Sequence, residues 1–355
     1  MSRVSEFALN LRYAFRPNKP RLFFRLAGAV IKSYVFRRPP LRYVDFAIGF
    51  ACNLKCEHCF ATALQQPARR RMAVDDYARV ARECMSLGAV NFSFQGGEPL
   101  LFHNLGEIIA ACQPSRNVIS VTTNGTLLTE ERVAELKRWG VDILTISLDS
   151  ADAAEHDRFR GAAGSFEKTM AGIRLALAQG LRVTLGTVVT HQTVRSEGIR
   201  ALARLAQELR VVLYFILPVP AGRWTDNRAM FLTPDDLAFV ENWTRQSRYL
   251  RTDFQANLGN YGCGAVKEIL YLTPYGDVLA CPFLHIALGN IFDQPVATIR
   301  ARALQNRYFA VYHQKCLAST DEEFIEKYLS KTFDAAALPL RWDLVFPPNG
   351  AEARE

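Results

Sequence analysis

The basic N-terminal part of the sequence lacks an apolar run long enough to cross a bilayer. Its longest uncharged stretch, residues 26–31, is far shorter than the roughly 20 residues that a spanning helix needs. A cleavable signal sequence is also lacking, so we expect a cytoplasmic protein whose eight cysteines stay reduced and can bind metals. The net charge of +8 comes without a basic-aromatic motif, and we therefore expect no nucleic-acid partner.

Residues 1–42 instead predict a basic helical segment. Apolar residues recur there at a helical spacing, and basic residues border the face that they form. Three interpretations stay open: a helix packed on the main domain, a weak contact with a membrane surface, and a surface that binds an acidic partner. The apolar residues are Leu22, Phe23, Leu26, Val30 and Ile31, and the basic ones are Arg21, Arg25 and Lys32.

The 355 residues, 49% hydrophobic and 22% charged, are typical of a globular protein with one large domain and an appendage. From residue 43, short β-rich runs alternate with segments of helical period. Six such repeats indicate an α/β fold with parallel strands, whose ligands bind beyond the carboxyl ends of the strands. Thr129 and Ser165 are expected helix N-caps. Strands are expected at 44–50, 90–95, 118–123, 142–149, 183–190 and 211–218, and helices near 74–87, 104–113, 128–139, 165–180 and 196–208.

The regular alternation of strand-like and helix-like segments ends near residue 225. A helix near 234–247 precedes "EILYLTPYGDVLACPF", which predicts a hairpin about a Pro-Tyr-Gly-Asp turn. We therefore predict four parts. They are a basic N-terminal segment (1–42), a core (43–225), a small α+β extension (226–345) and a disordered tail (346–355).

Three cysteines, Cys52, Cys56 and Cys59, lie together in "CNLKCEHCF" after the first expected strand. Their C-x3-C-x2-C spacing gives neither an even disulfide set nor a complete zinc quartet, and His58 is badly placed to close a tetrahedron with its neighbour Cys59. Three thiolates suit a four-iron cluster that keeps one iron open. Zinc and unligated thiols are the alternatives.

Polar motifs also follow the next three strands, at their carboxyl ends: "GGEP" (96–99), "NG" (124–125) and "DS" (149–150). In the first, Gly96 and Gly97 allow the backbone to approach a ligand closely, and Glu98 can accept hydrogen bonds from an ammonium group. An ordinary turn or helix cap is the alternative for each motif.

"CNLKCEHCF" and "GGEP" resemble the cluster loop and the methionine-binding motif of the radical S-adenosylmethionine (radical SAM) superfamily, over roughly residues 43–220. "TNG", "ISLDS" and "HDRFRG" are most similar to its branch with a SPASM or twitch extension. The resemblance implies a partial (β/α)6 TIM-like barrel with a C-terminal extension. It also implies a [4Fe-4S] cluster on Cys52, Cys56 and Cys59, whose open iron binds S-adenosyl-L-methionine.

The same resemblance implies that S-adenosyl-L-methionine is cleaved reductively to a 5'-deoxyadenosyl radical, which abstracts hydrogen from the substrate. It places several side chains near this cofactor, among them either of two arginines. Core packing, strand-end turns, a helix cap and a solvated arginine are the alternatives for these residues. They are Phe60, Gly96, Gly97, Glu98, Thr123, Asn124, Ser147, Asp149, and Arg158 or Arg160.

Cys263, Cys281 and Cys316 fall in a region that resembles the start of such an extension, whose later run of cysteines is missing here. They predict at most one auxiliary cluster, with an open iron or a non-cysteine fourth ligand for which His285 and His313 are candidates. The alternative is a set of buried thiols without a cluster. Buried thiols are also what we expect of two helical cysteines, Cys84 and Cys112.

The first functional hypothesis is an enzyme that oxidises its substrate or carries out a biosynthetic maturation step, with flavodoxin or ferredoxin as electron donor. The first 42 residues are too short for a leader-binding domain, which favours a small-molecule, lipid or leaderless peptide substrate, or a separate recognition protein. Arg223, at the end of the sixth strand, is a candidate anion contact near the substrate. The alternatives are a redox-neutral isomerisation or C-C bond formation, and a cluster-binding scaffold without turnover.

Overall fold

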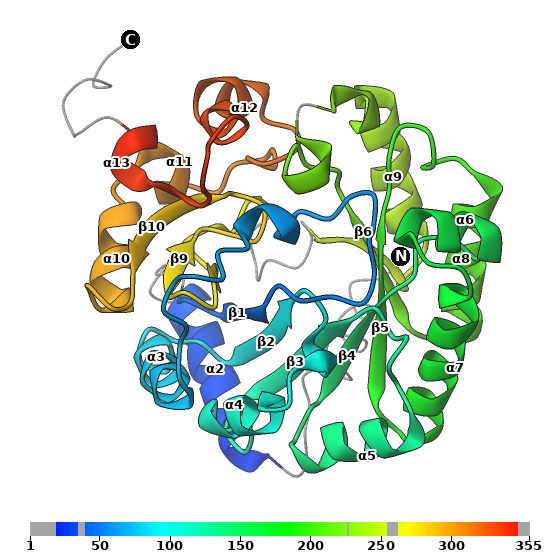
Figure 1. The fold of residues 1–355 in the computed structure, drawn as a ribbon, viewed down its shortest axis with the longest axis horizontal. Helices are drawn as coiled ribbons and strands as arrows, with labels where there is room; N and C mark the ends of the chain where they lie inside the picture. The colour runs from blue at the N-terminus through cyan, green and yellow to red at the C-terminus, as the bar shows by residue number, and fades with distance from the viewer. Residues whose placement is uncertain (1–18, 35–39, 226, 254–261, 347–355) are drawn as a thin grey trace.

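The computed structural model describes residues 19–34, 40–225, 227–253 and 262–346. Its strands form one 11-stranded sheet in the order β11-β10-β9-β8-β1-β2-β3-β4-β5-β6-β7. Figure 1 shows β1 to β6 fanned in a curve with the helices along their outer side. The predicted α/β partial barrel is confirmed. Its strands are β1 Tyr43–Gly49, β2 Asn91–Gly96, β3 Val118–Thr123, β4 Ile143–Ser147, β5 Arg182–Val188 and β6 Val212–Ile216.

Five of the core helices were expected within two residues of their observed bounds, and a sixth was missed. Thr129 caps α5 as expected, accepting a hydrogen bond from the backbone N–H of Arg132. The expected cap by Ser165 is wrong. Gly164 is the N-cap of α7, and Asp157 accepts hydrogen bonds from Gly164 N, Ser165 Oγ and Phe166 N. The core helices are α3 Val74–Ser86, α4 Leu105–Ala111, α5 Glu130–Arg138, α6 Ala153–Arg160, α7 Ser165–Ala178 and α8 Glu197–Glu208.

The two faces of the barrel strands differ in accessibility. On β4, the outward side chains Leu144 and Ile146 are fully buried under the helices, whereas the inward residues Thr145 and Ser147 are half-buried. Because side chains alternate between the faces of a strand, the inward face is the more open one. On β4 this inner face, the lumen side of the barrel, is thus less buried than the face under the helices.

The extension continues the barrel sheet on both edges. β7 Leu250–Thr252 pairs in parallel with β6, and β8 Ile269–Leu272 pairs in parallel with β1. The predicted hairpin is confirmed as antiparallel β8 and β9 Asp277–Leu279. The limits of the four predicted parts stay predictions, and residues 347–355 lie outside the described ones. The other elements are α9 Pro234–Gln246, β10 Ile286–Asn290, α10 Val296–Ala303, α11 Arg307–Ala310, α12 Glu322–Lys327, β11 Leu340–Arg341 and α13 Trp342–Val345.

One helix of the basic N-terminal segment, α2 Pro20–Tyr34, is described and packs on the barrel. Leu22 is buried together with Val90 and Val118, at the amino ends of β2 and β3. No helix in the described part of the chain has the length and apolarity to span a membrane. The packed-helix interpretation is therefore correct for α2, and it leaves open what the outer face of the helix contacts.

Candidate active site

The cysteine loop, residues 50–60, follows β1 at the carboxyl end of the barrel. Cys52 is exposed, Cys56 is buried and Cys59 is half-buried, so the three thiols differ in their access to solvent. The end of α6 holds the loop through two backbone hydrogen bonds, Lys55 N to Arg160 O (3.3 Å) and Glu57 N to Phe159 O (3.0 Å). The unpredicted helix α6 is thus one of the elements that position the loop.

Arg160 connects the cysteine loop to the end of β4. Its Nε donates to Asp149 Oδ2 at 2.5 Å, and its Nη1 donates to Cys56 Sγ at 3.6 Å. Burial is the largest single effect on Asp149 and would raise its pKa, but the charge and hydrogen bond of Arg160 together with the charges of His58 and His156 bring the net pKa below its ordinary value. Arg158, two residues earlier, is exposed. The structure therefore separates the two candidate arginines: Arg160 lies at the cysteines and Arg158 does not.

The glycines of "GGEP" let two backbones meet. A Cβ on Gly96 would lie 2.2 Å from Gly49 O, and one on Gly97 would lie 2.1 Å from Ala51 O. Gly97 N and Glu98 N donate to those same two oxygens at 2.8 Å each. The close approach that these glycines allow is thus between the ends of β1 and β2, which positions the cysteine loop.

Glu98 is fully buried and joins the ends of β2 and β3. Its Oε1 accepts hydrogen bonds from Leu100 N (3.1 Å) and Thr123 Oγ1 (2.7 Å), and its Oε2 accepts one from Asn124 N (2.8 Å). Burial raises its pKa, and these donors partly offset that rise. Thr123 and Glu98 therefore orient each other, while Oε2 keeps acceptor capacity.

Asn124 reaches from the end of β3 to the cysteine loop. Its Nδ2 donates to Asn53 Oδ1 at 2.9 Å and lies 4.0 Å from Cys52 Sγ. Its Oδ1 accepts from the backbone and the side chain of Thr126. Glu98, Asn124 and Arg160, from three motifs far apart in the sequence, thus converge on Cys52 and Cys56.

Two other residues that the sequence analysis predicted near the cofactor, Ser147 and Phe60, are not part of the contacts around Cys52 and Cys56. Ser147 ends β4 on the lumen side and is half-buried, whereas its expected companion Asp149 is buried and engaged with Arg160. Phe60 packs edge-on against Phe283 of the extension, with ring centroids 5.2 Å apart. The structure therefore puts Phe60 at the junction of barrel and extension.

Arg223, the candidate anion contact, lies against the cysteine loop. Its Nη1 donates to Lys55 O at 2.9 Å and its backbone N–H donates to Cys59 O at 3.1 Å. Gly222 has φ +62°, and a Cβ there would lie 2.2 Å from Cys59 O. The segment after β6 therefore packs against the loop after β1.

Cys263, Cys281 and Cys316 come from three separate loops of the extension and lie within electrostatic range of one another. Burial raises the pKa of each thiol, that of Cys281 to about 12. Backbone N–H groups point at the sulfurs: those of Ala265 and Leu317 at Cys263, those of Phe283 and Leu284 at Cys281, and that of Ala318 at Cys316. Donors of this kind stabilise thiolates and cluster sulfurs.

The candidates for a fourth ligand differ in their surroundings. His285 is buried beside Phe60, and its ring donates a hydrogen bond to the carbonyl of Pro282. Burial lowers the pKa of His285 to about 4. The ring of His313 stacks on Tyr308. Asp253, which the sequence analysis did not single out, acts electrostatically on Cys263, Cys281 and Cys316. It stands at the end of β7, where no sequence motif marks it.

Neither Cys52, Cys56 and Cys59 nor Cys263, Cys281 and Cys316 are arranged as a preformed site for one metal ion. In the described ranges, no three His, Cys, Asp or Glu side chains converge closely enough to hold one metal ion. A structural zinc needs such convergence at Zn–S distances of about 2.3 Å, whereas each thiolate of a four-iron cluster binds a different iron and so stands farther from the others. Cys84 and Cys112 are fully buried in the helical layer, as predicted.

A polar row crosses the lumen below the cysteine loop. The strand register places Tyr271 of β8, Asp45 of β1 and Ser93 of β2 side by side. Asp45 is 4% exposed, and burial raises its pKa to about 7, although Ser93, Gln95 and Tyr43 partly offset the rise. The Tyr271 hydroxyl is buried and has no hydrogen-bond partner among the residues that the structure describes. An acid inside the apolar run "VDFAIGF" was the sequence signal that we missed.

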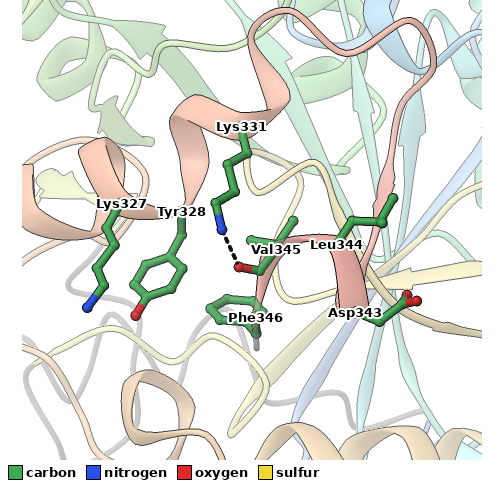
Figure 2. A pocket seen from close by; sticks show the side chains of 7 residues that line it. All are labelled: Lys327, Tyr328, Lys331, Asp343, Leu344, Val345 and Phe346. Carbon is green, nitrogen blue, oxygen red and sulfur yellow. Dashed lines mark hydrogen bonds between the residues drawn. The ribbon is translucent and has the colours of Figure 1, made fainter. Parts of the chain in front are cut away.

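A pocket between α12 and α13 lies away from these residues. Figure 2 shows Lys327, Tyr328 and Lys331 facing Asp343 and the residues up to Phe346, with Lys331 Nζ donating to Val345 O at 2.8 Å. None of the predicted site residues lines it. We assign it no part in the site.

Comparisons with known proteins agree with this geometry. Residues 47–206 match the model of the radical SAM superfamily. The AdoMet-dependent heme synthase of Nitratidesulfovibrio vulgaris is 26% identical over 78% of this chain and 84% of its own length. That of Methanosarcina barkeri is 28% identical over 73% and 81%. The crystal structure of Streptococcus suis SuiB bound to precursor peptide SuiA has a TM-score of 0.60 at 18% identity, covering 77% of this chain and 68% of SuiB.

The family match ends within the barrel, whereas the matches to the two heme synthases and to SuiB cover too much of the chain to end there and so include C-terminal residues. The likeness to SuiB confirms the fold. The cysteine loop, the "GGEP" segment and the matched region coincide in the chain. Residues 47–206 of this chain therefore form a radical SAM domain, and the chain is an enzyme.

Proposed function

We propose that Cys52, Cys56 and Cys59 hold a [4Fe-4S] cluster at which the enzyme cleaves S-adenosyl-L-methionine reductively. The observation that carries this proposal is the convergence of the cysteine loop, Glu98, Asn124 and Arg160 at one end of the barrel. When bound, the cluster and S-adenosyl-L-methionine supply a 5'-deoxyadenosyl radical that abstracts hydrogen from the substrate.

The protein's own residues prepare this chemistry in three ways. The Arg160 guanidinium beside Cys56 favours the thiolate form that a metal ligand needs, and Asp149 fixes its orientation. The spare acceptor capacity of Glu98 Oε2 suits the amino group of the methionine moiety. Asn124 holds the side of the loop that carries Cys52.

The substrate, we propose, enters the lumen from the carboxyl ends of the strands. Half-buried inward residues such as Thr145 and Ser147 give it polar contacts. The heme synthases point by their name to a small-molecule product, and the SuiB structure holds a precursor peptide. We propose an oxidation or a maturation step on a small molecule or a peptide, with Phe60 and Ser147 near the adenosyl group.

A cluster on Cys263, Cys281 and Cys316 would accept the second electron of an oxidation. The backbone donors around the three sulfurs support this proposal. Asp253 joins His285 and His313 as a candidate fourth ligand because it acts on all three cysteines. A redox-neutral isomerisation would not need this second cluster, so counting the clusters bears on the choice of reaction.

Anaerobic reconstitution followed by an assay for 5'-deoxyadenosine and methionine tests the proposed cleavage. With dithionite as reductant, we expect both products from the wild-type protein and none from Cys56→Ala. The matched control, Cys112→Ala, removes a buried thiol outside the site and should retain cleavage. An intact cluster without cleavage would favour the scaffold alternative.

Iron and sulfide counting tests the auxiliary cluster separately. We expect about eight irons in the wild-type protein, and about four after simultaneous replacement of Cys263, Cys281 and Cys316 by alanine, because each cubane holds four irons. About four irons in both proteins would show that the extension holds no cluster.

A further inference from the structure

The net positive charge of this protein resides entirely in its first 42 residues. They hold ten of the 43 lysines and arginines but one of the 35 acidic residues, so the remaining 313 residues carry a net charge of −1. A basic sequence segment of this kind, with apolar residues among the basic ones, is typical of segments that bind anionic lipid surfaces. The barrel and extension together carry almost no net charge to compete with it.

Helix α2 displays two aromatic side chains on the outside of the barrel. Phe23 is 59% exposed and Phe24 is 74% exposed, and their rings contact each other edge-on at 5.8 Å. They follow Leu22, which is 1% exposed and packs inward. Successive residues of a helix point about 100° apart, so the burial of Leu22 turns both phenylalanines outward.

Polar contacts fix this orientation. The Lys19 ammonium pairs with Asp142 at 2.5 Å and donates to Asn117 O at 3.2 Å, and both partners are buried. Arg25 donates to Asn117 Oδ1 and Ala89 O. The helix is thus held on the amino ends of the strands, and rotation that would bury the phenylalanines would break these contacts. Arg21, beside them, is exposed.

We propose that the outer face of α2, with Arg21, Phe23 and Phe24, docks the enzyme on an anionic phospholipid bilayer. The phenylalanine rings enter the interface, and the basic N-terminal residues attract the anionic headgroups. The cysteine loop lies at the opposite, carboxyl ends of the strands. The mouth of the lumen therefore faces away from the bilayer, and the substrate enters from the aqueous side.

Co-sedimentation of the full-length reconstituted enzyme with vesicles tests this proposal. We expect binding to vesicles of phosphatidylcholine with about 30% phosphatidylserine and little to pure phosphatidylcholine. Phe23→Ser with Phe24→Ser should weaken partitioning at least tenfold, and Arg21→Glu at least threefold. Raising the salt from 0.1 M to 0.5 M should weaken it further, since the Debye length shrinks below about 10 Å.

Leu344→Ser is the matched control, because Leu344 is 61% exposed but lies on α13 of the extension. It should leave partitioning unchanged. Absence of binding to the anionic vesicles, or binding that survives the double phenylalanine change, would overturn the proposal. A dimer in analytical ultracentrifugation that the double change dissociates, without vesicle binding, would assign the face to a second copy and likewise overturn it.

Discussion

Replacing Arg160 by methionine should destabilise the protein strongly, because it leaves the carboxylate of Asp149 buried without its 2.5 Å partner. Arg160 is 7% exposed and so is Asp149. Removing one member of such a pair typically costs about 3–5 kcal/mol. Arg158→Met, two positions away on the exposed side of α6, should change the free energy of unfolding by less than about 0.5 kcal/mol.

Urea unfolding of the cluster-free protein, followed by circular dichroism, measures these differences without interference from iron loss. The cost of Arg160→Met should be largest near neutral pH. The pKa of Asp149 is lowered in the folded state, so its stabilising contribution is present above about pH 4 and is lost as the pH falls. The difference in the free energy of unfolding between the wild type and Arg160→Met should therefore become smaller at acidic pH.

A second change distinguishes a buried charge from lost packing. Adding Asp149→Asn to Arg160→Met removes the unpaired carboxylate, so the double variant should be more stable than Arg160→Met alone. A double variant that is less stable than Arg160→Met would refute the reasoning. So would equal costs for Arg158→Met and Arg160→Met.

Two further substitutions test the strand ends and the lumen. Gly97→Ala should lower the free energy of unfolding by about 1–3 kcal/mol or more, because its Cβ would meet Ala51 O at 2.1 Å. Gly186→Ala is the control, since its Cβ would lie 3.5 Å from its nearest neighbour. Equal losses for the two variants in urea unfolding would contradict the packing argument. The pKa of Asp45 is raised in the folded state to about 7, so the free energy of unfolding falls as the pH rises from about 4 to about 7 and levels off above that. Between pH 5 and pH 8, the free energy of unfolding of Asp45→Asn should therefore rise relative to that of the wild type by on the order of 1 kcal/mol or more, at 1.36 kcal/mol per pKa unit. Parallel pH profiles of thermal unfolding for the two proteins would contradict this.

The barrel could be predicted from the sequence because its strands are apolar runs bounded by turns. Each outward face is covered by helices, so strands such as 118–123 are buried enough to stand out. The helix α6 could not be predicted in the same way. "AAEHDRFR" is mostly polar, and its helix depends on the cap by Asp152 and on contacts with the cysteine loop.

In the candidate site, too, some residues could be predicted from a local sequence pattern and others could not. Spacing alone brought out Cys52, Cys56 and Cys59, because a loop motif is local. The choice between Arg158 and Arg160 depends on which side of α6 faces the loop, and the roles of Asp253 and Asp45 depend on strand register. Such contacts join residues far apart in the chain, which no local pattern encodes.

The most direct measurement of the central claim is electron paramagnetic resonance of the reduced protein that lacks Cys263, Cys281 and Cys316. If Cys52, Cys56 and Cys59 hold a four-iron cluster with an open iron, its spectrum should shift when S-adenosyl-L-methionine is added. A spectrum that the nucleotide leaves unchanged, or a protein that binds one zinc ion in place of iron, would contradict the account.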